Sequence, residues 1–253
     1  MSCDRGAAGG TGAEPGTEGT GKRLKIAVIP KGTTHEFWKA VHAGAAKASQ
    51  ELDVDIVWKG PLKEDDLKQQ IDLVQSFTAQ RVDGILLAPL NEKALAKAVK
   101  DASRFKIPVV VIDSALKGKH HVSFVATDNR QAGKLAGQRM AKLLDGKGKV
   151  VVLRYQEGSA STANREQGFL EAIKAHGGIE VVSDNQYGGA TTESAFTASE
   201  SLLIAKQAVD GGVNGVFCPN ESTTFGMLLA LRKLGLAGKL ELVGFDASDK
   251  LIK

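Results

Sequence analysis

Short apolar runs alternate with amphipathic stretches along the chain from Leu24 to its end. Most of these runs are apolar at every position rather than at every second one, which is typical of strands covered on both faces. We therefore predict strands at residues 24–29, 55–58, 84–88, 108–112, 122–126, 149–153, 180–183, 215–218 and 241–244.

Between these runs, apolar residues recur at helical spacing and predict helices with one core-facing side. We expect the following groups to be core: Phe37, Val41 and Ala45; Leu67, Ile71 and Val74; Leu135, Met140 and Leu143; Phe169 and Ile173; Leu202 and Val209. Regular alternation of strand and helix favours parallel sheets joined by right-handed crossovers. The sequence thus predicts an α/β protein.

The two halves of the chain repeat each other loosely. Residues 82–86 are echoed by residues 213–217, and each stretch is followed by a proline, a helix and a strand that ends in aspartate, at Asp113 and Asp246. Two similar, doubly wound parallel-sheet lobes are the simplest explanation. We predict an N-terminal lobe at 23–126 and a C-terminal lobe at 127–253, after a tether at 1–22.

The tether consists almost entirely of Gly, Thr, Ala, Glu and Ser. Such a segment buries too little apolar surface to offset its ordering entropy, so we expect it to be flexible. Cys3 followed by this spacer resembles a processed bacterial lipoprotein, which makes Cys3 a candidate lipid-attachment residue. No basic and apolar leader segment precedes it, so either the start codon is misplaced, or the leader has been removed, or Cys3 has no role.

Composition excludes several functional classes. The net charge is only +4, and Lys and Arg stand beside Asp and Glu, which predicts solvated helix faces and no nucleic-acid surface. No apolar run approaches the ~18 residues of a membrane span. The chain has two cysteines, and its adjacent histidines, His120 and His121, lie in a polar turn, so we expect neither a metal site nor a cofactor.

Candidate chemistry lies just after the predicted strands, where ligands bind in open parallel sheets. The first half has Lys31, His35, Phe37, Trp38, Asp113 and Ser114 there, and the second half has Tyr155, Tyr187, Asn220 and Asp246, with Arg165 nearby. Sugars have C–H faces that stack on aromatic rings and hydroxyls that pair with carboxylates, amides and guanidinium groups. The set therefore favours a sugar site.

Some of these residues have ordinary structural explanations. Phe37 shares a helical face with Val41 and is the aromatic most easily explained as core, whereas Trp38 lies one position round and favours ligand stacking. Asp113 and Asp246 are also suited to capping a helix or turn. Their matched placement at equivalent strand ends favours binding.

Five stretches are together typical of one superfamily: residues 25–29, 37–41, 125–129, 161–169 and 243–246. Over residues 24–253 the chain resembles the ribose-type periplasmic binding proteins of sugar ABC transporters, which have the type I periplasmic-binding fold. The resemblance implies a monomeric protein of the periplasm or cell envelope. Such a protein closes two lobes around a small sugar and delivers it to a membrane permease, without catalysis.

The resemblance also implies roles for individual residues. Phe37 and Trp38 match a pair that stacks on the sugar, and Tyr187 matches a third aromatic. Hydrogen bonds to the hydroxyls are implied for Asp113, Arg165, Asn220 and Asp246. Three other positions, His35, Lys31 and Ser114, stand where ribose binders usually have Asn, Ser and Arg. These departures favour another pentose, a hexose or a polyol over ribose.

Members of this family continue beyond the Gly-Phe-Asp stretch at 244–246 with a further strand–helix unit and two more crossovers. The resemblance therefore implies that the C-terminal part of the fold is missing here. On this interpretation only one of three inter-lobe connections, near 126–128, is present. We expect such a chain to be less stable than a complete relative.

Two other functions are consistent with a doubly wound fold. A sugar-responsive transcriptional regulator needs an N-terminal helix-turn-helix domain, and residues 1–22 have no helical apolar pattern. A dinucleotide enzyme needs G-x-G-x-x-G after its first strand, and a hydrolase needs a G-x-S-x-G turn, but neither motif occurs at Lys31–Glu36 or around Ser159. Solute binding is the function that the sequence favours.

Overall fold

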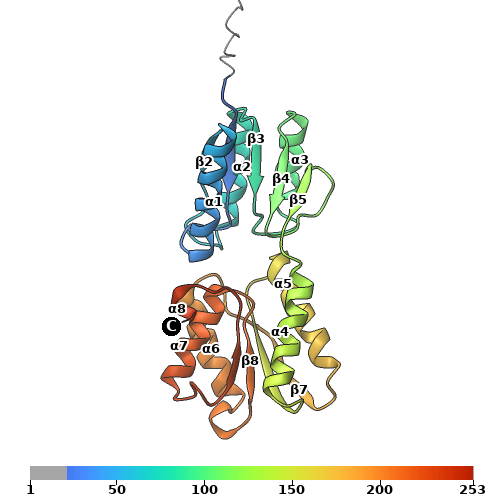
Figure 1. Cartoon of the computed structure of the whole chain (residues 1–253), viewed down its shortest axis with the longest axis vertical. Coiled ribbons are helices and arrows are strands. Elements are labelled where there is room, and N and C mark those ends of the chain that lie inside the picture. Colours follow the sequence, from blue (N-terminus) through green and yellow to red (C-terminus); the bar gives the residue numbers. More distant parts are fainter. Residues whose placement is uncertain (1–21, 253) are drawn as a thin grey trace, which may run out of the picture.

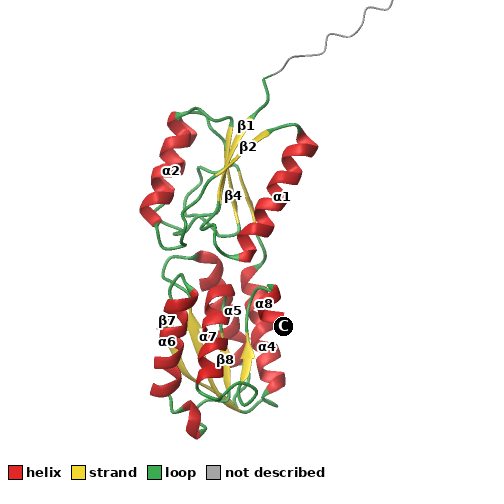
Figure 2. Cartoon of the chain, turned by 90° about the vertical axis from the view of Figure 1, so that its left-hand side faces the viewer, coloured by secondary structure: helices red, strands yellow, loops and turns green. Residues whose placement is uncertain are grey.

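The computed structural model describes residues 22–252, and within that range the chain forms two parallel sheets. The first sheet has the strand order β2-β1-β3-β4-β5. Its elements are β1 (Lys25–Ile29), α1 (Glu36–Leu52), β2 (Asp55–Trp58), α2 (Leu67–Ala79), β3 (Gly84–Leu87), α3 (Ala96–Arg104), β4 (Val109–Ile112) and β5 (Ser123–Val125). Helices α1 and α2 cover opposite faces of this sheet (Figure 2).

The second sheet has the order β7-β6-β8-β9. Its elements are α4 (Asn129–Leu143), β6 (Gly148–Arg154), α5 (Ala160–Lys174), β7 (Ile179–Tyr187), α6 (Thr192–Ala205), the 3₁₀ turn η1 (Ala208–Asp210), β8 (Gly215–Phe217), α7 (Glu221–Lys233), β9 (Glu241–Val243) and α8 (Asp249–Ile252). Figure 1 shows the two lobes stacked end to end, with the chain passing between them from β5 to α4.

The strands occur where the apolar runs predict them, and every strand pair in the described residues is parallel. Strand β6 shows why its run lacks polar positions. Val150 and Val152 belong to a core that includes α4 and α5, whereas Val151 and Leu153 belong to one that includes α6 and α7. Because both faces of the strand are covered, residues 150–153 are all apolar. Strand β7 continues to Tyr187, four residues beyond the predicted end.

The predicted helix faces are correct for Phe169 and Ile173, which are both fully buried. The prediction is wrong for Leu135 and Val209, which are 56% and 64% exposed. Helix α4 instead turns a face of small residues, including Gly133, towards α5. The two helix backbones approach so closely there that a large side chain has no room, so Leu135 lies on the outer side.

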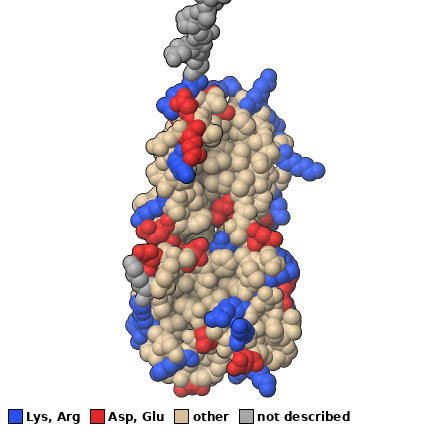
Figure 3. All heavy atoms as spheres, viewed as in Figure 1, with Lys and Arg blue, Asp and Glu red and all other residues tan. Residues whose placement is uncertain are grey.

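Charged side chains of both signs are interspersed over the two lobes on the face shown in Figure 3. Among residues 22–252, no helix is both long enough and apolar enough to cross a membrane. The same range contains no group of three or more His, Cys, Asp or Glu side chains that could hold a metal ion. Cys3 and nearly all of the predicted tether lie outside the described residues.

Glu166 is a buried carboxyl group on α5, behind the loop that follows β6. Its side chain accepts hydrogen bonds from the Tyr155 backbone N–H at 3.2 Å and from Arg154 at 3.3 Å. Burial raises the pKa of Glu166 to about 7, and these two partners only partly offset the effect. The folded protein therefore holds a proton on Glu166 at pH values where the unfolded chain has lost it.

We predict that replacing Gly168 with alanine destabilises the protein by at least about 2 kcal/mol, because overpacking a tight contact forces the backbone to shift. A Cβ atom at position 168 would lie 2.1 Å from the carbonyl oxygen of Arg130. Gly44→Ala is the matched control, because a Cβ there meets nothing within 4 Å. That control should gain up to ~1 kcal/mol in helix propensity. Urea unfolding of both variants measures the difference, and equal effects would contradict the close packing of α4 and α5.

We predict that stability falls as the pH rises from 5 to 8, and that the fall is smaller in Glu166→Gln. The folded-state pKa lies above that of a free glutamate, so the stabilising contribution is complete below about 4.5 and is lost as the pH passes 7. Melting temperatures across this range measure the effect. Glu180→Gln, an exposed position on β7, is the control and should keep the wild-type profile. A Glu166→Gln profile parallel to wild type would refute the assignment.

Candidate functional site

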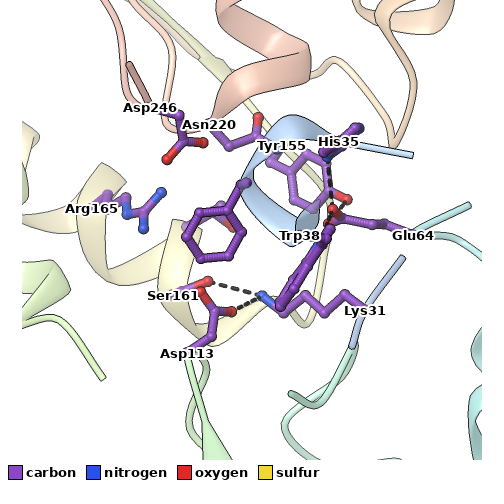
Figure 4. Close-up of a pocket in the computed structure, with 12 residues that line it drawn as sticks. Lys31, His35, Trp38, Glu64, Asp113, Tyr155, Ser161, Arg165, Asn220 and Asp246 are labelled. Atoms are coloured by element: carbon purple, nitrogen blue, oxygen red, sulfur yellow. Dashed lines mark hydrogen bonds and ion pairs between the residues drawn. The ribbon is translucent and has the colours of Figure 1, made fainter. Parts of the chain in front are cut away.

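A cavity lies between the two lobes, at the carboxyl ends of strands from both sheets (Figure 4). It contains about 350 Å³ of free space, part of it open to solvent. The first lobe contributes Lys31, His35, Phe37, Trp38, Glu64 and Asp113, and the second contributes Tyr155, Ser161, Thr162, Arg165, Asn220 and Asp246. Polar and aromatic side chains from both sheets thus line one cavity.

Asp113 and Asp246 occupy matching places, just after β4 and β9. Both have left-handed backbone conformations, with φ of 62° and 68°, which residues other than glycine rarely adopt. Strain of this kind persists where the surrounding structure imposes it, and it is concentrated at functional sites. The shared conformation turns one carboxylate from each lobe towards the cavity (Figure 4).

Lys31 is a buried cation with one ion pair and two hydrogen bonds. Its ammonium lies 2.8 Å from the Asp113 carboxylate and donates to the hydroxyls of Ser161 at 3.0 Å and Ser159 at 3.4 Å. Its side chain is 4% exposed, so this pairing offsets the cost of removing a charge from water. The serines belong to the second lobe, so Lys31 bridges the cleft.

Arg165 is fixed by the second lobe and faces Asp246. Its guanidinium donates to the Asn129 side chain and to the Pro219 carbonyl, both at 2.8 Å, and stacks 4.3 Å above the Phe245 ring. Burial raises the pKa of Asp246, while the charge of Arg165 opposes that shift. Asp246 also accepts a hydrogen bond from the Glu221 backbone N–H at 2.8 Å. The guanidinium is therefore held rigidly beside the carboxylate.

Asn220 and Asp128 both begin helices. The Asn220 side chain accepts from the Thr223 hydroxyl at 2.6 Å and caps α7 while it lines the cavity. Asp128 caps α4 by accepting from the Gln131 N–H at 3.0 Å. Asn129, beside Asp128, donates to the Asp113 carbonyl at 3.4 Å, so the segment between the lobes is tied to the site.

The two aromatic residues at the start of α1 differ in burial, and Trp38 is the more buried one. Trp38 is 2% exposed and packs edge-to-face against Phe37, with ring centroids 4.8 Å apart. Phe37 is only partly buried and stands at the cavity. Both rings line the cavity, with Trp38 the more deeply buried of the two.

Glu64 is a central residue of the cavity that the sequence analysis missed. Its carboxylate accepts hydrogen bonds from His35 Nδ1 at 2.8 Å, Trp38 Nε1 at 2.6 Å and Tyr155 Oη at 2.6 Å. In sequence it belongs to a charged stretch, 63–66, that is typical of a solvated turn. The strand order could have indicated it, because β2 runs parallel to β1 and ends at the same end of the sheet. The loop after β2 therefore lies beside the cleft.

Two predicted residues do not line the cavity. Tyr187, at the end of β7, is 47% exposed, and its ring lies 6.0 Å from the Arg154 guanidinium. Ser114 is buried behind the cavity wall, where its hydroxyl accepts a hydrogen bond from the Ser161 N–H at 3.0 Å. The structure brings the other nine candidate residues together at the cavity, Tyr155 among them.

Comparison with known proteins identifies the family. A model described as "Periplasmic binding protein domain" matches residues 26–253. The D-ribose/D-allose-binding protein of Pseudomonas aeruginosa is 32% identical over 239 residues, which cover 90% of this chain and 72% of that protein. The ribose import binding protein of Haemophilus influenzae is 28% identical and covers 90% of this chain and 75% of its own length.

Solved structures agree with this assignment. The periplasmic component of an ABC-type sugar transport system from Hahella chejuensis superposes with a TM-score of 0.86 at 33% identity, over 90% of this chain and 82% of that one. A solute-binding protein of an ABC transporter from Agrobacterium vitis, with D-fucose bound, gives 0.84 at 36% identity, over 90% and 78%. The chain therefore belongs to the periplasmic binding protein domain family, as its strand order, its two lobes and its inter-lobe cavity indicate.

Proposed function

We propose that this protein is the solute-binding component of an ABC transporter and that it binds a small neutral sugar between its lobes. The observation that carries the proposal is the pair of matched aspartates, Asp113 and Asp246, which face one cavity from two sheets, with Arg165 beside them. A ligand that bonds to both carboxylates holds the lobes together. A transport receptor needs this coupling between occupancy and shape.

The chemistry of the wall fits a sugar. Carboxylates accept hydrogen bonds from hydroxyls, a guanidinium donates to ring and hydroxyl oxygens, and the Phe37 ring offers an apolar face to C–H groups. We assign ligand contact to Lys31, His35, Phe37, Trp38, Asp113, Arg165, Asn220 and Asp246, all of which line the cavity.

The charges in the wall favour a neutral ligand. Lys31 is paired with Asp113, His35 with Glu64, and Arg165 faces Asp246. An anionic ligand would leave one of the buried carboxylates without a compensating charge, which is costly in a site shielded from water. Sugar acids and sugar phosphates are therefore disfavoured.

The relatives support this ligand class. They include proteins named for ribose and allose, and structures with D-fucose or D-arabinose bound. These sugars differ in number of carbons and in stereochemistry, so they favour a monosaccharide of five or six carbons without selecting one. The relatives are named as binding proteins of transport systems, and we assign no catalytic step to this cavity.

We propose that binding acts through closure. The sugar enters an open cleft, contacts one lobe and then stabilises the closed form by bridging both, because it has higher affinity for that form. Residues 23–126 and 127–253 move as two bodies, with the hinge near 126–128. The closed form then docks on a membrane permease as a monomer. We also propose a location in the periplasm or cell envelope, with Cys3 as the lipid-attachment residue.

Thermal unfolding with a panel of pentoses, hexoses and polyols at millimolar concentration tests the function. A ligand at 1,000 times its dissociation constant adds about 4 kcal/mol to stability. We expect at least one neutral sugar to raise the melting temperature and its uronic acid to have no effect. A panel in which no sugar shifts the transition, or in which only the acids do, would contradict the proposal.

We predict that Asp246→Asn weakens affinity for that sugar roughly 10- to 150-fold, the usual cost of losing a hydrogen bond to a charged group. Asparagine tolerates the left-handed backbone at this position, so the fold should be kept. Asp145→Asn is the matched control, since Asp145 has φ of 49° and is exposed away from the cavity. Calorimetric titration measures both variants, and unchanged affinity in Asp246→Asn would remove it from the site.

A further inference from the structure

Glu64 joins the two lobes through a buried carboxylate. It lies in the turn between β2 and α2, with its side chain 7% exposed. One oxygen accepts from His35 at 2.8 Å and from Trp38 at 2.6 Å, both within the first lobe. The other oxygen accepts from the Tyr155 hydroxyl of the second lobe at 2.6 Å. Figure 4 shows the three rings gathered around this one carboxylate.

A second contact crosses the cleft at the same residue. The Gln156 side-chain amide donates to the Glu64 backbone carbonyl at 2.7 Å. Two adjacent residues of the second lobe therefore bond to two different groups of Glu64. These bonds exist only while the lobes are together, because the donors and the acceptors belong to different sheets.

The local structure is shaped to hold this side chain. A Cβ atom at Gly32 would lie 2.8 Å from Glu64 Cγ, so only a glycine leaves room for it in the present packing. Burial raises the pKa of Glu64, but the hydrogen bond and charge of His35, together with Lys31, lower it below its ordinary value. Glu64 is therefore a charged acceptor at neutral pH, and hydrogen bonds to an ionised acceptor are stronger than neutral ones.

The same contacts change what the rings offer to a ligand. The indole N–H of Trp38 and the hydroxyl of Tyr155 are both occupied by Glu64. Their donors are directed away from the sugar, so these side chains contribute mainly ring surface to the cavity. The hydroxyl-binding groups, such as Asp113, Arg165 and Asp246, are separate from them (Figure 4).

We propose that Glu64 is a positioning residue that latches the closed lobes through Tyr155 and so slows release of the bound sugar. This inference rests on the proposed function. The latch forms only after closure, whereas the sugar enters the open cleft. Its loss should therefore raise the dissociation rate and leave the association rate almost unchanged, as is usual for interactions made late in binding.

A double-mutant cycle on the full chain tests the latch. Tyr155→Phe removes only the hydroxyl, and Glu64→Gln keeps the shape but replaces one acceptor oxygen with a donor. We expect each variant to raise the dissociation rate of the best-bound sugar about tenfold. The sugar should dissociate from the double variant no faster than from the more impaired single variant, because both changes break the same hydrogen bond. Stopped-flow fluorescence gives both rate constants, and Glu180→Gln is the charge-matched control.

The outcomes separate the latch from the function. If wild type binds a sugar and the two effects multiply in the double variant, or if the change is confined to the association rate, the latch is refuted while sugar binding stands. If no sugar binds, the proposed function fails. The same four proteins are then compared by urea unfolding without ligand. If the effects of the two substitutions on the unfolding equilibrium constant multiply to within a factor of two, the latch is overturned.

Discussion

Burying a charge away from water is costly unless that charge is paired and hydrogen-bonded, and the cleft of this protein holds several such charges. Lys31 is satisfied by an aspartate of its own lobe and by serines of the other. Glu64 is satisfied by two rings of its own lobe and a tyrosine of the other. Their pairing is complete only when the lobes meet, which connects the electrostatics of the site to the shape of the molecule.

The fold brings these groups together because each lobe is a parallel sheet whose strands end at the cleft. The repeat between the halves places Asp113 and Asp246 at corresponding ends, in the same left-handed conformation. Groups behind the site hold Arg165 in position, namely the Asn129 side chain at the start of α4 and the Pro219 carbonyl. The scaffold is shared within the family, and we propose that side chains at these strand ends select the ligand.

Much of the fold could be predicted from sequence because strands covered on both faces have continuous apolar runs. Helix faces were harder, since Leu135 stands five residues before Met140, about 140° around the helix, and lies outside the contact made by Gly133 and its neighbours. The strand ends identified most cavity residues. Glu64 was missed because a buried carboxylate in a charged turn has no local signature. Tyr187 was included because a position at the end of a strand does not reveal that its side chain is exposed to solvent.

Ligand-driven closure is the central claim, and small-angle X-ray scattering tests it most directly. The protein should be measured alone and with a saturating concentration of a sugar already shown to raise its melting temperature. The account predicts that the ligand-free curve is that of a more open molecule and that sugar moves it to the curve calculated from the closed structure. Identical curves with and without a bound sugar would contradict it.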